Sequence, residues 1–161
     1  MCNTIILADY HNKQHADDIV YLLNQYAKHP MGGETELKVS TKENLISKLK
    51  GVPGAFSILV YQQKKAIGLA NCFMGFSTFQ CKPLINVHDI YVINAYQGKQ
   101  IAQEILKKIQ EIAIQRSCCK ITLEVLEGNL IAQKAYKNFG FSPYELKPEF
   151  GQAIFMEKKL T

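Results

Sequence analysis

Residues 88–102 read His88-Asp89-Ile90-Tyr91-Val92-Ile93-Asn94-Ala95-Tyr96-Gln97-Gly98-Lys99-Gln100-Ile101-Ala102, and they decide the fold of this chain. The stretch begins inside a run from Leu84 to Ile93 that is rich in Val, Ile and Tyr, which is typical of a β-strand. It ends in the first turn of a segment from Gln100 to Ser117 with isoleucines at helical spacing, which predicts a helix. The polar residues between the two predict a tight turn that leads from strand to helix.

The turn from Gln97 to Gln100 has the features of an anion site. N–H groups at the start of a helix lack a partner within the helix and carry partial positive charge, so they suit an anion such as pyrophosphate. Gly98 makes the backbone flexible, and Lys99 adds a cation. A glycine turn before a helix is more often only a turn, so the residues alone leave both interpretations open.

The composition of the chain limits which classes of protein it can belong to. The chain has 161 residues, 47% of them hydrophobic, which fits one domain with a sizeable core. The net charge of +5 suits an acidic ligand, but Arg116 is the only arginine, which argues against a nucleic-acid reader. The five cysteines, Cys2, Cys72, Cys81, Cys118 and Cys119, follow no framework spacing, so we expect reduced structural thiols, no metal and a cytoplasmic location. We expect neither a signal peptide nor a membrane span.

The pattern along the chain predicts alternating strands and helices. We expect strands at 4–8, 56–61, 66–79, 84–93, 121–125 and 153–160, and helices at 15–27, 40–49, 100–117 and from 129 to a C-cap at Gly140. Ser40 and Glu43 have the spacing of a capping box. Two strands joined by the central helix require a right-handed crossover and lie parallel. The sequence therefore predicts one α/β domain with a mixed sheet.

Two segments of the chain resemble the GCN5-related N-acetyltransferases (GNAT), which transfer an acetyl group from acetyl-coenzyme A to an amine. In the first segment, Gln97 and Ala102 match the family pattern of Gln or Arg, two residues, Gly, one residue, then Gly or Ala. Gln100 departs from it, because the family has glycine there, and Asn94 stands where a proline is frequent. The second segment holds Leu123-Glu124-Val125, Asn129, Ala132, Ala135-Tyr136 and Phe139-Gly140-Phe141.

The resemblance covers almost the whole chain in element order. It implies a single N-acetyltransferase domain over residues 1–161, with a mixed, mostly antiparallel sheet of six to seven strands flanked by about four helices. It also implies that the central strand splays from the next parallel strand and holds coenzyme A in the gap. We therefore expect acetyl-coenzyme A as the acyl donor and no metal.

The resemblance implies which residues bind that cofactor. The backbone of the central strand pairs with the pantetheine arm as an added strand would, and the amides of the turn cradle the pyrophosphate. The residues implied are Ile90, Tyr91, Val92, Gln97, Gly98, Lys99, Gln100, Ile101, Ala102, Asn129, Ala132 and Tyr136. Lys99 is equally explained as a solvated surface lysine, and Asn129 as a helix N-cap that can also serve the cofactor.

Acetyl transfer to an amine needs a base, an oxyanion donor and an acid. The resemblance implies that Tyr136 protonates the departing thiolate, and the N–H of Val92 is a candidate for the oxyanion. His88 stands where relatives carry an acid, and imidazole can act as a base near neutral pH. By strand alternation we expect His88 on the face of Ile90 and Val92, and Asp89 on the other face unless a bulge rotates it. Asp89, Glu124 on the polar face of the next strand, and water are the other candidates for the base.

The acceptor amine is less constrained by the sequence. We expect a small-molecule or peptide amine, with the loop from Pro30 to Glu34 and the aromatics from Phe76 to Phe79 as substrate wall. Glu34 and Glu36 are candidates for attracting a cation, although a plain connecting loop explains them as well. The leading hypothesis is direct transfer in a ternary complex. A non-catalytic acyl-coenzyme A-binding module and a basic RNA-associated domain are the alternatives, and a homodimer is a further expectation.

Overall fold

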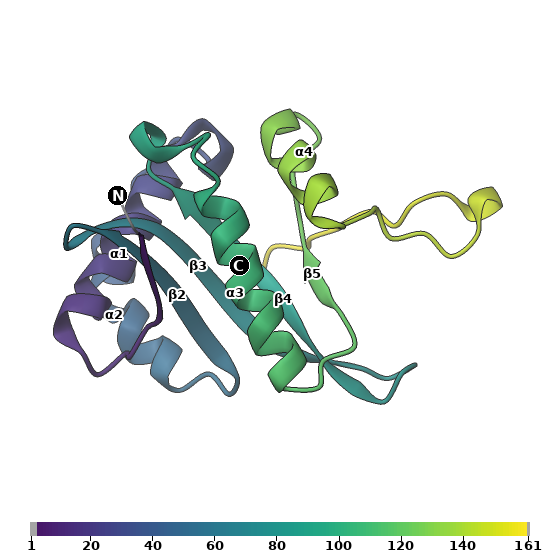
Figure 1. Ribbon diagram of the computed structural model, residues 1–161, viewed down its shortest axis with the longest axis horizontal. Coiled ribbons are helices and arrows are strands. Elements are labelled where there is room, and N and C mark those ends of the chain that lie inside the picture. Colours follow the sequence, from purple (N-terminus) through teal and green to yellow (C-terminus); the bar gives the residue numbers. More distant parts are fainter. Residues whose placement is uncertain (1–2, 161) are drawn as a thin grey trace. The chain divides into compact units, whose positions relative to one another are not determined.

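The computed structural model describes residues 3–160, and within them one mixed five-stranded sheet carries the fold (Figure 1). The strands are β1 (Thr4–Leu7), β2 (Ala55–Gln62), β3 (Lys65–Ser77), β4 (Lys82–Val92) and β5 (Ile121–Leu123), in the spatial order β1-β2-β3-β4-β5. Neighbours are antiparallel from β1 to β4, whereas β4 and β5 are parallel. This confirms the predicted mixed α/β fold and the parallel crossover.

Four α-helices are described: α1 (Lys13–Lys28), α2 (Val39–Lys50), α3 (Ile101–Gln115) and α4 (Leu130–Phe139). Short 3-10 turns cover Pro30–Gly32, Asn94–Tyr96 and Pro148–Phe150. The chain divides into two compact units, residues 1–123 and residues 124–161. The first unit holds the whole sheet with α1, α2 and α3, and the second holds α4 and the C-terminal segment.

The two faces of the sheet pack against different helices. Leu59 and Leu69 are opposite each other in the β2–β3 ladder and form a buried core with Ile19 and Leu22 of α1. The next residue, Gly68, lies on the other face, where an added Cβ would come within 3.2 Å of the Cδ1 atom of Ile105 in α3. Figure 1 shows α3 in front of the sheet. The register therefore assigns each strand residue to an α1 face or an α3 face.

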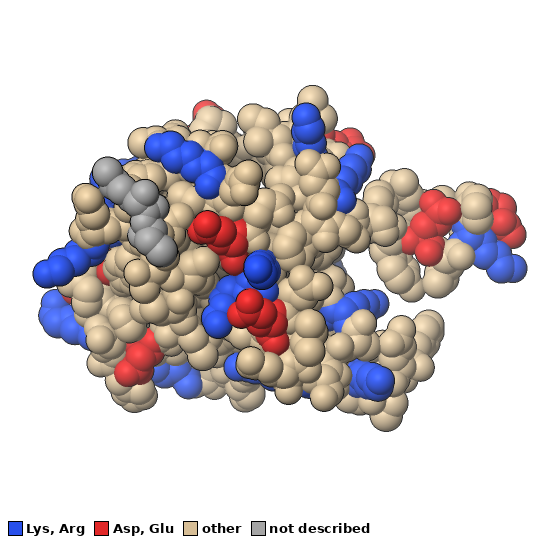
Figure 2. All heavy atoms as spheres, in the orientation of Figure 1, with Lys and Arg blue, Asp and Glu red and all other residues tan. Residues whose placement is uncertain are grey.

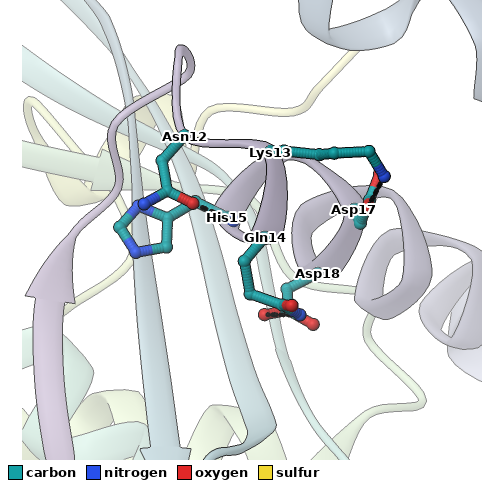
Figure 3. A network of polar contacts seen from close by, with 6 residues as sticks. All are labelled: Asn12, Lys13, Gln14, His15, Asp17 and Asp18. Carbon is teal, nitrogen blue, oxygen red and sulfur yellow. Dashed lines mark hydrogen bonds and ion pairs between the residues drawn. The ribbon is translucent and has the colours of Figure 1, made fainter.

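The start of α1 is specified by local polar contacts (Figure 3). The side chain of Asn12 accepts a hydrogen bond from the N–H of His15, which satisfies one of the free amides of the first turn. Lys13 pairs with Asp17, and Gln14 donates to Asp18, one helical turn onward in each case. These contacts set where α1 begins, and so which of its residues reach the sheet.

Two local predictions were wrong. The sheet has five strands among residues 3–160, not six to seven, because residues 153–160 form no strand. The N–H of Ala153 donates to the oxygen of Tyr144, and just before this segment Gln152 forms an isolated bridge with Glu145. Ser40 does not cap α2, because the helix begins at Val39 and Ser40 lies inside its first turn. Cys2 lies outside the described residues.

Candidate active site

A β-bulge interrupts the β3–β4 ladder at His88, where the stretch 88–102 begins. Asn71 pairs with Asp89 and Cys72 pairs with Val87, so His88 is an extra residue in β4. An extra residue bends the strand and lets two successive side chains share one face. The expected alternation was therefore wrong in this strand: His88 does not share a face with Ile90 and Val92.

Instead, His88 and Asp89 both lie on the α1 face. Asp89 is opposite Asn71 and accepts a hydrogen bond from its side-chain Nδ2 at 2.9 Å. The ring of His88 meets the ring of Phe73 edge to face, with centroids 5.6 Å apart. His88 is exposed and Asp89 is half-buried. The bulge thus brings an imidazole and a carboxylate together on one surface of β4.

Aromatic rings lie on the same face beside Asp89. Tyr91 stacks on Tyr26 of α1, with centroids 5.5 Å apart, and meets His29 edge to face at 6.1 Å. Burial raises the pKa of Tyr26, and the negative charge of Asp89 raises it further. Both phenols therefore stay neutral at physiological pH, so the carboxylate is bordered by uncharged aromatic surface that can contact a cation.

The opposite edge of β4 is open beyond the bulge. The β4–β5 ladder contains three pairs and ends at Val87 with Leu123, whereas β4 continues to Val92. The N–H of Ile93 donates to the oxygen of Ile67 in β3. Because backbone groups alternate in direction along a strand, the N–H and C=O groups of Ile90 and Val92 point away from β3. This edge can accept an extended partner as an added strand.

The side chain of Gln97 closes the turn that follows β4. Its Nε2 donates to the backbone oxygen of Val92 at 3.0 Å and to Oδ1 of Asn94 at 3.1 Å. The turn itself is exposed from Gln97 to Gln100. The first residue of the family pattern therefore fixes the path from strand to helix, and its side chain is occupied by that task.

Gln100 adopts a left-handed conformation, with φ of 63° and ψ of 8°, directly before α3. Glycine is the residue that tolerates this conformation without strain, which explains the glycine of the family pattern. Gly98 is also left-handed, with φ of 75° and nothing within 4 Å of an added Cβ. The backbone around Gly98 therefore leaves room for a ligand near the amino end of α3.

Two lysines gather at this turn. The Nζ atom of Lys99 lies 5.1 Å from the ring centroid of Tyr96, and Nζ of Lys65 lies 5.8 Å from it. Lys99 is exposed, so its ammonium is available to solvent and to an anion alike. On the face drawn in Figure 2, basic and acidic side chains are interspersed, without a continuous patch of one sign.

The second unit holds the other predicted site residues. Asn129 caps α4, and its side-chain Oδ1 accepts a hydrogen bond from the N–H of Ala132 at 3.1 Å. Tyr136 is buried and meets Phe141 edge to face at 6.0 Å, and Gly140 ends the helix with φ of 105°, as predicted. Glu124 is exposed and follows the end of β5, so the expected placement on a strand was wrong.

The expected substrate wall is only partly available for binding an amine. Glu36 is engaged already, because its Oε1 lies 2.9 Å from Nζ of Lys42 and also accepts from Asn24. The hydrogen bond from Lys42 lowers the pKa of Glu36. Phe76 and Phe79 are exposed at the far end of the β3–β4 hairpin.

Sequence reasoning did not identify Ser57, Asn71 or Tyr26 as site residues. Ser57 and Asn71 are the buried polar residues of the described chain, with 0% and 3% of their surface exposed. Each stands in an otherwise apolar strand, and that was the available signal. Within residues 3–160 no group of three or more His, Cys, Asp or Glu side chains is arranged to hold a metal, and no helix is long and apolar enough to cross a membrane.

Comparison with known proteins agrees with this geometry. The profile of the Acetyltransferase (GNAT) family matches residues 21–141. Thialysine N-epsilon-acetyltransferase of Bos taurus is 34% identical over 74 residues, which are 46% of this chain and 43% of that enzyme. The enzyme of the same name from Mus musculus is 38% identical over 56 residues, 35% of this chain and 33% of that one. The alignments thus span less than half the length of these relatives.

Solved structures share the fold at low sequence identity. An integron cassette protein from the mobile metagenome of V. cholerae has a TM-score of 0.76 at 23% identity, covering 98% of this chain and 94% of its own. AAC(6')-Iy in complex with a bisubstrate analogue of coenzyme A has a TM-score of 0.76 at 17% identity, covering 99% and 100%. With the family profile spanning most of the sheet and three of the four helices, this chain belongs to the GNAT acetyltransferase family.

Proposed function

We propose that this protein is an acetyl-coenzyme A-dependent N-acetyltransferase for a primary amine carried by a cationic small molecule or peptide. The observation that carries the proposal is the bulge in β4. It sets Asp89 and His88 on one face, and the ladder with β5 ends beside it, where the N–H groups of Ile90 and Val92 point away from β3. Acceptor and donor sites are thereby adjacent on a single strand.

The described residues fit coenzyme A. The edge of β4 beyond Val87 is not paired with β5, and its outward N–H groups suit an extended pantetheine arm. The exposed turn from Gln97 to Gln100 leads into the amino end of α3, which suits a pyrophosphate. Of the similar structures, AAC(6')-Iy was solved with a coenzyme A bisubstrate analogue. We assign the backbone of Ile90 to Val92 to the arm, and the amides from Gln97 to Ala102 to the phosphates.

The surface around Asp89, which we assign to the acceptor amine, favours a cation. A carboxylate bordered by the neutral rings of Tyr26 and Tyr91 attracts an ammonium by charge and by cation–π contact. The names of the relatives point to amine acceptors, since they are thialysine and aminoglycoside acetyltransferases. An amine that is protonated in water must lose a proton before it can attack.

Bound acetyl-coenzyme A supplies the acetyl group and a thiolate leaving group. In our proposal Asp89, with His88 beside it, binds the ammonium and takes one proton, directly or through water. The amine nitrogen then forms a bond to the acetyl carbon while the carbon–sulfur bond breaks. The N–H of Val92 stabilises the negative charge on the acetyl oxygen. On the resemblance of its motif to the family, we assign Tyr136 as the acid that gives its phenolic proton to the sulfur. The phenolate then takes the second proton of the former ammonium from the amide nitrogen, directly or through water, and Asp89 releases its proton to solvent. Asn129 and Ala132 are assigned to the same cofactor on that resemblance.

The test is calorimetry with acetyl-coenzyme A, followed by thiol release against a panel of polyamines, aminoglycosides and lysine peptides. We expect binding of the cofactor and turnover with at least one cationic amine. Tyr136→Phe should lower kcat with little change in cofactor affinity. Cofactor binding without turnover on any amine, together with no effect of Tyr136→Phe, would contradict the enzymatic proposal.

A non-catalytic acyl-coenzyme A-binding module is the second candidate function. Gln100 motivates it, because a left-handed residue with a side chain stands where the family has glycine. The same calorimetry separates the two candidates, since a module binds the cofactor and releases no thiol. The single domain, cytoplasmic location and homodimer stay predictions, and light scattering of the purified protein would test the homodimer.

A further inference from the structure

A chain of four hydrogen-bonded side chains crosses the α1 face of the sheet and ends at Asp89. The hydroxyl of Tyr10 lies 2.9 Å from Oγ of Ser57. The hydroxyl of Ser57 donates to Oδ1 of Asn71 at 2.6 Å, and Nδ2 of Asn71 donates to Oδ2 of Asp89 at 2.9 Å. These hydrogen bonds thus link the loop after β1 to three successive strands.

Every donor in this chain points toward Asp89. A serine hydroxyl has one proton, and Ser57 gives it to Asn71, so Tyr10 must be the donor to Ser57. Turning the amide of Asn71 around would set its oxygen against the carboxylate, two acceptors face to face. The direction of the chain is therefore fixed, and its last acceptor is a carboxylate oxygen.

The strand register and the burial of Ser57 and Asn71 make this series of hydrogen bonds rigid. Ser57 is directly opposite Asn71, and Asn71 is directly opposite Asp89, so the contacts follow from strand pairing. Ser57 and Asn71 are almost fully buried, and no buried side-chain polar atom of the described residues lacks a partner. A satisfied network in a medium of low dielectric holds its members in one geometry more strongly than a solvated one.

We propose that Asn71 is a positioning residue for amine acetylation, which holds Asp89 aimed at the acceptor, with Ser57 and Tyr10 as its supports. This inference rests on the proposed role of Asp89 in binding and deprotonating the amine. The titratable groups that surround the carboxylate are Tyr26 from α1, Cys72 from β3, and His88 and Tyr91 from β4 itself. Asn71 is the neutral donor among them.

The central experiment is a double-mutant cycle between Asn71→Leu and Asp89→Asn. Leucine has a similar volume and no donor, so the carboxylate loses its hydrogen bond without a large cavity. We expect kcat/KM for the amine to fall about tenfold to a hundredfold in Asn71→Leu, the loss typical of a hydrogen bond to a charged group. KM for acetyl-coenzyme A should stay unchanged.

The double variant tests whether Asn71 acts through Asp89. In the Asp89→Asn background, Asn71→Leu should lower amine kinetics by less than about twofold, because the carboxylate it serves is gone. An equal loss in both backgrounds would mean that Asn71 is merely structural and would overturn the inference. If Asp89→Asn itself leaves amine kinetics intact, the proposed function of Asp89 fails instead.

Two further variants keep the test decisive. Cys72→Ala removes a buried neighbour of Asn71 on the opposite face, so it should lower stability without lowering kcat/KM for the amine. If Asn71→Leu does not fold, Ser57→Ala removes the donor to Asn71 at small cost in volume. It should also lower kcat/KM for the amine, by a smaller factor, and an unchanged kcat/KM in a folded Ser57→Ala protein would overturn the inference.

Discussion

Replacing Gln100 by glycine should stabilise the protein, although glycine usually destabilises. Gln100 has φ of 63°, a conformation that costs a residue with a Cβ about 1–2 kcal/mol and glycine almost nothing. Glycine also gives the unfolded chain more freedom, which takes back about 0.4–1 kcal/mol. The net gain is about 0.5–1 kcal/mol, and a domain of this size converts it into a rise in Tm of about 1–4 °C.

The assay is thermal unfolding of the purified protein, followed by the KM for acetyl-coenzyme A. Gly98→Ala is the matched control, because Gly98 has φ of 75° and open space around an added Cβ, so strain is its main cost. Its Tm should fall while that of Gln100→Gly rises. The KM of Gln100→Gly should fall as well, since a side chain leaves the proposed phosphate turn. A lower Tm for Gln100→Gly would refute the left-handed turn.

Two other predictions concern the turn and the core. Gln97→Ala removes the hydrogen bonds that join the turn to Val92 and Asn94. The KM for acetyl-coenzyme A should therefore rise about threefold to tenfold, with little change in kcat. The control Gln110→Ala, on the exposed side of α3, should change neither kcat nor KM. Burial, and next the charge of Asp89, raise the pKa of the Cys72 thiol from 9.0 to about 12. The unfolded chain then loses this proton first as pH rises, so the free energy of unfolding should fall by about 1 kcal/mol between pH 9 and pH 10. Denaturant titrations at each pH measure this fall in the free energy of unfolding. It should disappear in Cys72→Ala and persist in the control Cys81→Ala, which changes an exposed thiol. If it persists in Cys72→Ala, groups other than Cys72 cause it.

Periodicity predicted the helices well because it reports a property of each segment alone. The stripe of apolar residues in α1 and in α3 faces the sheet, and Asn129 and Gly140 sit at the two ends of α4 as their capping chemistry requires. The segment from 153 to 160 has the composition of a strand, yet a strand also needs a partner edge. Composition carries no information on that partner, and so the sixth strand was predicted wrongly.

The residues that organise the proposed acceptor site depend on pairing across strands. Ser57 and Asn71 are separated by 14 positions in the sequence and Asn71 and Asp89 by 18, and the register alone brings them together. A polar residue within an apolar strand was a sign that a buried partner exists. Which partner it is cannot be read from either strand alone, because a shift of one residue would exchange the two faces.

The bulge at His88 resolves a conflict that is visible in the sequence. Val87 is buried on the α3 face, and regular alternation would send Asp89 to that face as well, where an unpaired carboxylate among apolar side chains is costly. Two successive polar residues between Val87 and Ile90 were the signal that the alternation breaks here. One extra residue lets Asp89 meet Asn71 instead. Because a bulge also bends and twists its strand, it explains why the ladder with β5 stops at Val87, one residue earlier. The same irregularity thus creates both the polar face and the open edge that the proposed reaction requires.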